Sequence, residues 1–103
     1  MDSKVYEMQA EYFRALSHPV RIRIINFLRK GERCVCDIVP YLKEEQSNVS
    51  RHLATLKRAG ILSSEKRGVS VYYQIKDKNV YRVLDLVLDS LKKITREKAD
   101  ILG

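Results

Sequence analysis

Residues 46–75, QSNVSRHLATLKRAGILSSEKRGVSVYYQI, decide the fold of this chain. The first half predicts a helix from about Glu45 to Ala59, with Gly60 placed to end it. The apolar residues of this helix share a narrow arc at about 100° per residue, and they are Val49, Leu53 and Leu56. Polar residues cover the opposite side, so one face packs on a core and the other meets solvent or a partner.

The second half of this stretch alternates between apolar and polar residues, as a half-buried strand requires. One face of the expected strand carries Val69, Val71, Tyr73 and Ile75. A partner strand is expected at Leu62–Lys66, with Arg67-Gly68 as the hairpin tip because Gly tolerates a positive φ. A basic hairpin that follows two short helices is typical of a winged helix-turn-helix fold.

The residues before this stretch predict three more helices. A stripe of apolar residues predicts a first helix over residues 3–16, and Pro19 is placed to begin a second helix that ends near Leu28. A third helix, between about Cys34 and Leu42, should be short or bent because Pro40 has no amide hydrogen to donate. The predicted fold class is therefore mostly α with a small β-hairpin wing.

The residues after this stretch predict a long helix from about Asn79 to Thr95. Apolar residues recur at helical spacing along it, at Val80, Val83, Leu84, Val87, Leu88, Leu91 and Ile94. So long a stripe exceeds what one small domain needs to cover its core. We therefore expect the helices at both termini to form a homodimer interface, since two-fold homodimers are common. The alternative is that the last helix only covers its own core.

Length and composition limit the function. The 103 residues, taken as a single domain of residues 1–103, carry a net charge of +7. Residues 47–76 supply five of these seven charges, which favours double-stranded DNA as a partner because phosphates bind Lys and Arg by releasing counterions. No apolar run approaches the about 18 residues of a membrane span, so no membrane partner is expected and the protein is placed in the cytoplasm. No catalytic set or phosphate loop is recognisable, which predicts a protein that is not an enzyme.

The polar face of the predicted helix has the residue types that read a major groove. Arg bonds to guanine, Asn to adenine, and Ser or Thr to bases or phosphates. We expect the N-terminal end of this helix to reach deepest, and Lys66 and Arg67 on the wing to contact phosphates or the minor groove. The helix residues concerned are Gln46, Ser47, Asn48, Ser50, Arg51, His52, Thr55 and Arg58.

Two other interpretations of this surface stay open. An ordinary solvated helix face would explain any one of these residues. A winged-helix module that binds only proteins would lack strong salt-dependent DNA binding. His52, at the edge of the apolar arc, is expected to be a partly buried structural histidine or a phosphate contact rather than a metal ligand. His18 is interpreted as local structure at a helix start.

The cysteines, Cys34 and Cys36, are too close in sequence for a useful structural staple, and a cytoplasmic setting would keep them reduced. Spacing alone favours small packing residues at a helix start. In a regular helix, residues i and i+2 point about 200° apart. One ion can therefore bind both sulfurs only if residues 34–36 lie outside the helix or the helix unwinds there. We therefore expect ion binding to distort the segment that leads into the reading helix, the helix predicted from about Glu45 to Ala59.

Three stretches of the chain resemble the ArsR/SmtB family of metal-responsive bacterial and archaeal repressors. They are ALSHPVRIRII at residues 15–25, CVCDI at residues 34–38, and SNVSRHL at residues 47–53 followed by LKRAGIL at residues 56–62. The resemblance implies a homodimeric winged-helix repressor that binds a two-fold operator without inducer and leaves it when inducer binds.

The resemblance also matches Cys34 and Cys36 to the inducer site of the family's arsenic and heavy-metal sensors. It implies no permanent cofactor and an inducer such as As(III), Sb(III), Cd(II), Pb(II) or Zn(II), with Asp37, water, a small thiol or a partner residue completing the ligands. Val39 stands where arsenite sensors often have a third Cys, and residues 79–95 have no His for the family's zinc site in the last helix. The alternative is a regulator that responds to thiol redox state or to no small ligand. A bridge across one residue is strained, whereas an intersubunit or mixed disulfide is not.

Overall fold

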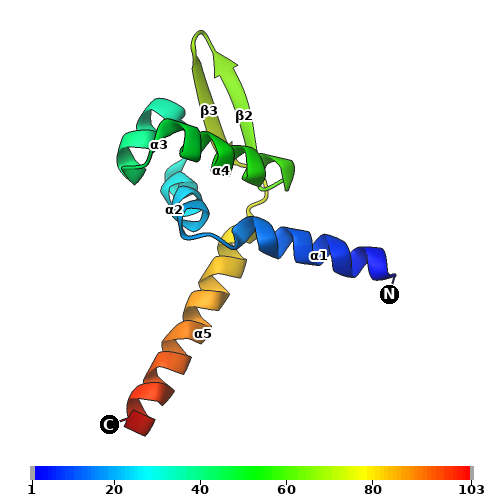
Figure 1. The fold of residues 1–103 in the computed structure, drawn as a ribbon, viewed down its shortest axis with the longest axis vertical. Helices are drawn as coiled ribbons and strands as arrows, with labels where there is room; N and C mark the ends of the chain where they lie inside the picture. Colours follow the sequence, from blue (N-terminus) through cyan, green and yellow to red (C-terminus); the bar gives the residue numbers. More distant parts are fainter. Residues whose placement is uncertain (1, 103) are drawn as a thin grey trace.

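The computed structural model describes residues 2–102, and the side chains of residues 2–98. Met1 and Gly103, which the predicted domain of residues 1–103 includes, lie outside the described residues. A body of helices and a small sheet carries one projecting helix at each end of the chain (Figure 1). The elements are α1 (Ser3–Leu16), α2 (Pro19–Phe27), a 3-10 turn (Leu28–Lys30), β1 (Arg33–Cys34), α3 (Val35–Leu42), α4 (Gln46–Arg58), β2 (Leu62–Arg67), β3 (Ser70–Ile75) and α5 (Asn79–Leu102).

The reading helix, α4, packs on the core with the arc that the sequence predicts. Val49, Leu53 and Leu56 are fully buried, and Gly60 follows with φ +81°, a conformation that favours Gly. Burial of each such aliphatic side chain contributes about 1.5–3 kcal/mol, so the core fixes which face of α4 points outward. The rest of the core consists mainly of Ile24, Ile25, Leu28, Ile38, Leu42, Ile61, Leu62 and Val80.

The sheet has three antiparallel strands in the order β1-β3-β2, one more than the sequence predicts. The additional strand, β1, has only two residues, and its Cys34 pairs with Tyr72 of β3. Two residues are too few to show the alternation by which a strand is recognised in a sequence. This pairing makes the cysteine segment part of the same sheet as the wing.

The hairpin turn lies at Gly68–Val69, one residue later than expected, because Arg67 still pairs with Ser70. Gly68 has φ +61°, which a two-residue hairpin turn requires. The expectation that Val69 lies on the buried face of the strand is wrong, since its side chain is 98% exposed at the tip of the wing.

Helix ends differ by a few residues from the expected ones. α2 ends at Phe27 and a 3-10 turn follows it. α3 is short, as predicted, and contains Pro40. It begins at Val35, so Cys34 precedes the helix. α5 continues to Leu102, beyond the expected end at Thr95.

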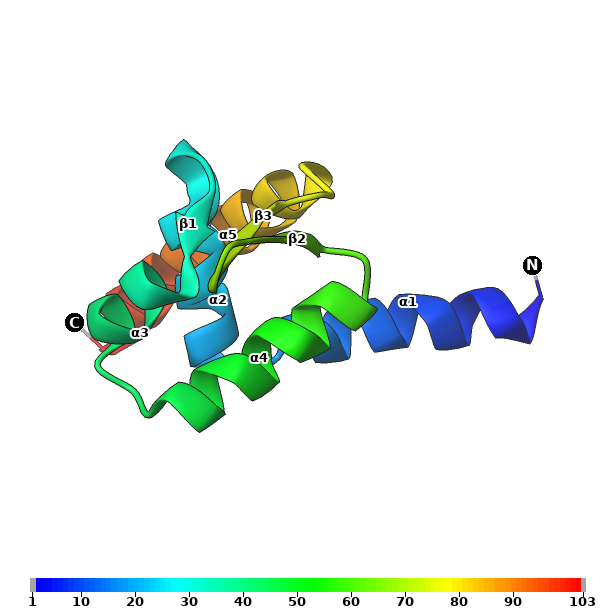
Figure 2. The same ribbon diagram turned by 90° about the horizontal axis from the view of Figure 1, so that it is seen from above.

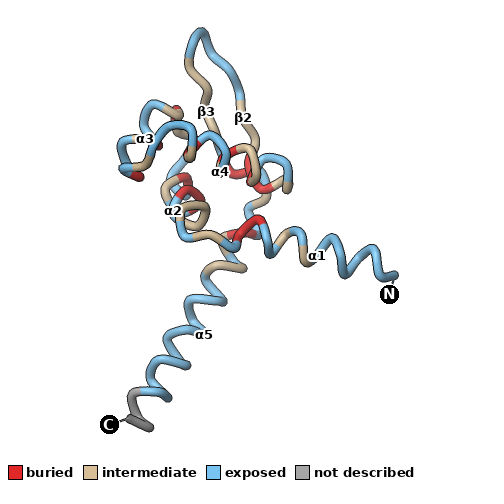
Figure 3. Tube along the Cα trace, viewed as in Figure 1, coloured by how far each residue is buried: buried red, intermediate tan, exposed pale blue. Residues whose placement is uncertain are grey.

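α1 and α5 extend away from the body and leave much of their surface uncovered (Figure 3), and Figure 2 shows the projection of α1 from above. The radius of gyration is 16.1 Å, against about 13 Å for a compact domain of this length. Large apolar side chains on both helices are exposed: Val5, Tyr6, Met8, Phe13, Leu86, Val87, Leu88, Leu91 and Ile94. Contact with the chain's own core thus explains only the beginning of the α5 stripe. In the described part of the chain, no helix has the length and apolarity needed to cross a membrane.

Candidate functional site

The outer face of α4 carries all the helix residues that the sequence predicts to contact DNA, and they divide between two flanks. Gln46 and Ser50 line a groove toward α3 and β3. A pocket toward the start of α2 is lined by Asn48, Arg51, His52 and Thr55. Ser47 and Arg58 are exposed between these flanks. Of the eight, only three are half-buried rather than exposed: Asn48, His52 and Thr55.

Hydrogen bonds order this face in the free chain. Arg51 donates to Asn48 Oδ1, and the Thr55 hydroxyl donates to the Arg51 carbonyl at 3.1 Å. Arg58 donates to the Thr55 hydroxyl at 3.4 Å. Side chains that are already ordered lose less rotamer entropy when a partner binds, so the face is prepared for contact with a groove.

The wing presents its two predicted cations differently. Lys66 is exposed, whereas Arg67 forms a bidentate ion pair with Glu32 at 2.6 and 2.8 Å and a further bond with Glu65 at 3.1 Å. Its guanidinium also stands over the ring of Tyr72 at 4.6 Å. The hydrogen bond from Arg67 lowers the pKa of Glu32. Sequence reasoning missed Glu32, because no local pattern connects residues this far apart in the chain.

Cys34 is the N-cap residue of α3, and its sulfur accepts a hydrogen bond from the Cys36 amide at 2.8 Å. Cys34 is extended and Cys36 lies in the first helical turn, which places their Cα atoms 5.0 Å apart, within the range of a disulfide. The structure joins the two sulfurs as a disulfide. It thus differs from the expected pair of reduced thiols. Because Cys34 lies outside α3, the two sulfurs come together without any unwinding of the helix. The distortion expected on ion binding stays a prediction.

Asp37 adds a third donor beside the two sulfurs. The ligand atoms of Cys34, Cys36 and Asp37 all lie within 4.8 Å of one another, the one such group of His, Cys, Asp or Glu among the described residues. Cys34 is buried, whereas Cys36 and Asp37 are exposed. Val39, which stands where the family's arsenite sensors often have a third cysteine, offers no ligand atom. In the reduced state this cluster supplies two soft sulfurs and one carboxylate, a set that suits thiophilic ions.

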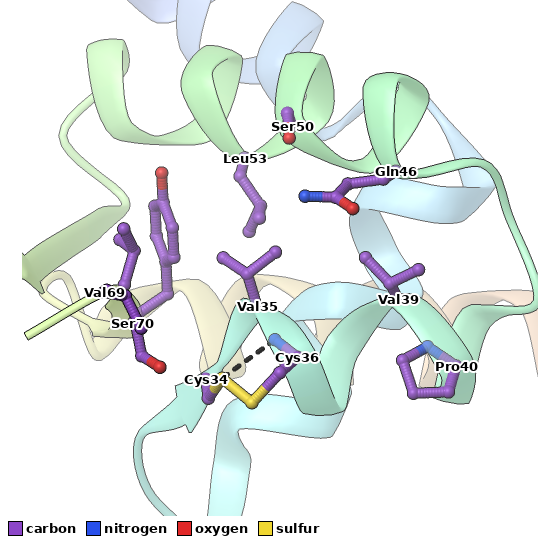
Figure 4. A pocket seen from close by; sticks show the side chains of 12 residues that line it. Cys34, Val35, Cys36, Val39, Pro40, Gln46, Ser50, Leu53, Val69 and Ser70 are labelled. Carbon is purple, nitrogen blue, oxygen red and sulfur yellow. Dashed lines mark hydrogen bonds between the residues drawn. A yellow bond between two sulfur atoms is a disulfide. The ribbon is translucent and has the colours of Figure 1, made fainter.

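The disulfide lines a cavity of about 490 Å³ between α3, α4 and β3, which we call the thiol groove. Figure 4 shows the two sulfurs on the α3 side, with Gln46 and Ser50 of α4 across the cavity. Apolar side chains lie between them, and Val69 and Ser70 of the wing complete one side. A chemical change at the sulfurs therefore occurs within the same cavity as the reading helix and the wing.

The order α2, α3, α4 and β-hairpin, with a polar and cationic outer face on α4, defines a winged helix-turn-helix transcription regulator that binds DNA. A family model described as bacterial regulatory protein, arsR family, matches residues 18–64, from the cap of α2 into β2. The chain belongs to this ArsR family.

Curated relatives agree with this assignment. An uncharacterized HTH-type transcriptional regulator of Methanocaldococcus jannaschii, MJ1325, is 41% identical over 80% of this chain and 93% of its own. The transcriptional repressor SmtB of Mycobacterium tuberculosis is 38% identical over 85% of this chain. The cadmium resistance transcriptional regulatory protein CadC of Listeria innocua is 36% identical over 73% of this chain. The chain spans 63% of SmtB and 64% of CadC, less than two thirds of either.

A solved structure shares the fold. The homodimeric winged helix-turn-helix DNA-binding domain Mb0332 of Mycobacterium bovis, a possible ArsR-family regulator, superposes with a TM-score of 0.78 at 26% identity, covering 88% of this chain and 84% of that one. The predicted winged-helix fold and family are therefore confirmed. Since the relatives are transcriptional regulators, the prediction that the chain is not an enzyme is confirmed as well.

Proposed function

We propose that the protein is a homodimeric repressor that binds a two-fold operator and leaves it when a thiophilic metal(loid) ion binds Cys34 and Cys36 in their reduced state. The observation that carries this proposal is the position of the two sulfurs at the start of α3, with Asp37 beside them. Both cysteines line a groove that they share with α4 and the wing. Because DNA is the proposed partner, we expect the protein to act in the cytoplasm.

The DNA contacts assigned to α4 rest on exposure and charge. Gln46, Ser47, Ser50 and Arg51 are exposed near the N-terminal end of the helix, the end that enters the major groove in helix-turn-helix proteins. Arg51 and Asn48 are the residue types that read guanine and adenine. Lys66 and Arg67 are assigned to the phosphate backbone, although Arg67 must first exchange its carboxylate partners.

The homodimer is supported by the uncovered apolar surface of α1 and α5. Tyr12 of α1 donates to Asp77 Oδ2, just before α5, at 2.8 Å, so both helices are anchored at one place in the body. Burial and this hydrogen bond raise the pKa of Tyr12 to about 12, so its hydroxyl stays protonated at a pH where an exposed tyrosine would ionise. A second copy offers the same apolar stripe for an isologous interface, and the Mycobacterium bovis neighbour is a homodimer.

The donor set supports As(III), Sb(III), Cd(II), Pb(II) or Zn(II) as inducer. Thiolates select soft or borderline ions, and Asp37 is at hand as a third ligand, with water, a small thiol or a partner residue as other candidates. The relative CadC is a cadmium resistance regulator by name. To weaken DNA binding by a factor of ~100, an ion need favour the non-binding conformation by only about 3 kcal/mol.

The test is fluorescence anisotropy of the reduced protein on the DNA upstream of its own gene, titrated with As(III), Cd(II) and Zn(II). Release of DNA in the parent but not in Cys34→Ser/Cys36→Ser is the expected result. Tight DNA binding that no ion weakens would contradict the metal(loid) assignment and leave the winged-helix regulator intact.

A second candidate, thiol redox sensing, is favoured by the disulfide itself. Metal binding and the disulfide exclude each other, because both use the same pair of sulfurs. Release of DNA by an oxidant such as diamide, reversed by a dithiol reductant, with no response to As(III), would favour the redox regulator. The opposite pattern favours the metal(loid) sensor.

A further inference from the structure

A second pocket lies on the flank of α4 that faces away from the thiol groove. It has a volume of about 550 Å³. At about 100° per residue, the α4 side chains that line this pocket lie on roughly the opposite side of the helix from Gln46 and Ser50. The start of α2 supplies the facing wall, and Glu44 comes from the connection between α3 and α4. Its lining residues are His18, Val20, Arg21, Glu44, Asn48, Arg51, His52 and Thr55.

Two histidines meet in this pocket, and the Nδ1 atom of each lies beside a nitrogen of α2. The rings of His18 and His52 have centroids 4.2 Å apart. His18 Nδ1 accepts a bond from the Val20 amide at 3.1 Å, and His52 Nδ1 stands 3.4 Å from Arg21 Nη1. The Val20 amide only donates, so Nδ1 of His18 is the acceptor in that bond.

The surroundings of His52 are predominantly positive. Burial is the largest cause that lowers its pKa. His18 at the N-cap of α2, Arg21 on α2 and Arg51 on α4 lower it further, while Glu44 alone opposes them. A second proton on His52 would therefore place a cation against Arg21. An anion in the pocket would remove this repulsion, so anion and proton favour each other.

Arg21 is only partly satisfied within the chain. Its Nη2 donates to the Arg14 carbonyl at 3.0 Å, but its buried Nε finds no hydrogen-bond partner among the described residues. The pocket thus collects guanidinium and imidazole donors. It also shares four lining residues with the predicted DNA-reading face, namely Asn48, Arg51, His52 and Thr55.

We propose that this pocket holds a phosphate of the operator backbone, and that its binding is coupled to proton uptake by His52, which packs against His18. The proposal rests on the proposed DNA binding, because the pocket opens beside the helix that enters the major groove and a backbone phosphate flanks that groove. Each subunit then carries one proton more in the complex than in the free protein. The association constant for DNA consequently falls as pH rises.

The experiment is fluorescence anisotropy of the reduced protein on the DNA upstream of its gene, from pH 5.5 to 8.5 at constant ionic strength. The matched variant is His18→Asn/His52→Gln. Asn keeps a side-chain cap for α2, Gln keeps an acceptor for Arg21, and neither can gain a proton. The chain has only two histidines, so the variant has none. Circular dichroism and the melting temperature establish that the variant folds.

The parent should lose affinity as pH rises through the range in which His52 in the complex loses its proton, by up to about tenfold per pH unit for each proton taken up. The variant should bind DNA with nearly constant affinity. At pH 6, the logarithm of its association constant should fall less steeply with the logarithm of salt concentration than that of the parent. The slopes should differ by about 0.9 for each phosphate that the variant no longer binds. A parent without pH dependence, or a folded variant that keeps it, would overturn the proposal. Failure of both proteins to bind DNA at any pH would instead overturn the proposed function.

Inorganic phosphate identifies the source of the anion. Added at constant ionic strength, it should compete with DNA for the parent and leave the variant unaffected. If it shifts the histidine NMR signals of the protein–DNA complex without weakening DNA binding, free phosphate occupies the pocket and the backbone assignment is overturned.

Discussion

Cys34 and Cys36 have different structural roles although they share the proposed site. Cys34 is buried and caps α3. Cys36 is exposed in the first helical turn, and its amide donates a hydrogen bond to the sulfur of Cys34. A cysteine at a helix N-cap holds its sulfur against amide donors that also favour a thiolate. Cys34 therefore contributes to the stability of α3 as well as to the chemistry of the site, whereas Cys36 contributes mainly to the chemistry.

This difference predicts unequal responses to Ser and Ala substitution. Under reducing conditions, Cys34→Ala should be less stable than Cys34→Ser by about 1 kcal/mol, because Ser caps the helix and Ala cannot. The matched pair Cys36→Ala and Cys36→Ser should differ little, since residue 36 is not the cap. Urea denaturation at one protein concentration measures the four free energies of unfolding. Equal Ser-to-Ala differences at both positions would show that the sulfur of Cys34 does not act as a cap.

At the scale of elements, the wing is connected to the cysteine segment by two links. β1 pairs with β3 through Cys34 and Tyr72, and Glu32, just before β1, holds Arg67 near the end of β2. Arg67 therefore has its charge neutralised in the free chain. Arg67 can contact a phosphate only if its ion pairs with Glu32 and Glu65 break. The free energy needed to break them opposes DNA binding.

Glu32→Gln should release this restraint and strengthen DNA binding roughly two- to fivefold, the size expected for an exposed ion pair. Fluorescence anisotropy at fixed salt measures the change. Glu97→Gln, which makes the same charge change at an exposed position on α5, controls for net charge and should have a smaller effect. Weaker binding by Glu32→Gln would mean instead that the ion pair holds the wing in the shape that binds DNA.

The elements that could be predicted from the sequence are those with long periodic patterns. The arc of Val49, Leu53 and Leu56 placed α4 within one residue at each end, because burial of that face decides the helix. β1 could not be predicted, since its two residues form a strand only through pairing with β3. The candidate site divides in the same way. The cysteines, Asp37 and the α4 residues follow from local sequence, whereas Glu32 and the His18–His52 contact depend on tertiary structure.

At the scale of the whole molecule, the two projecting helices leave an apolar surface that a monomer must expose to water. Leu91→Glu places a charge in the stripe of α5, where Leu91 is 52% exposed in the single chain. We expect this variant to be monomeric by analytical ultracentrifugation, because burying an unpaired carboxylate in an interface is costly. Arg82→Glu, nine residues earlier and so on the opposite side of the helix, should remain dimeric. A dimeric Leu91→Glu protein would place the interface elsewhere.

A dimer joined through α1 and α5 should read its operator as one rigid unit. Its two α4 helices should reach half-sites about 34 Å apart, one turn of DNA, or a multiple of that spacing. Inserting five base pairs between the half-sites, once footprinting has located them upstream of the gene, turns one half-site about half a turn away. The affinity of the parent should then fall toward its non-specific level, roughly a thousandfold or more. The Leu91→Glu monomer should bind weakly and equally to both DNAs, because one subunit reads one half-site. Equal affinity of the parent for the two operators would show that its subunits bind independently, and it would contradict a rigid dimer.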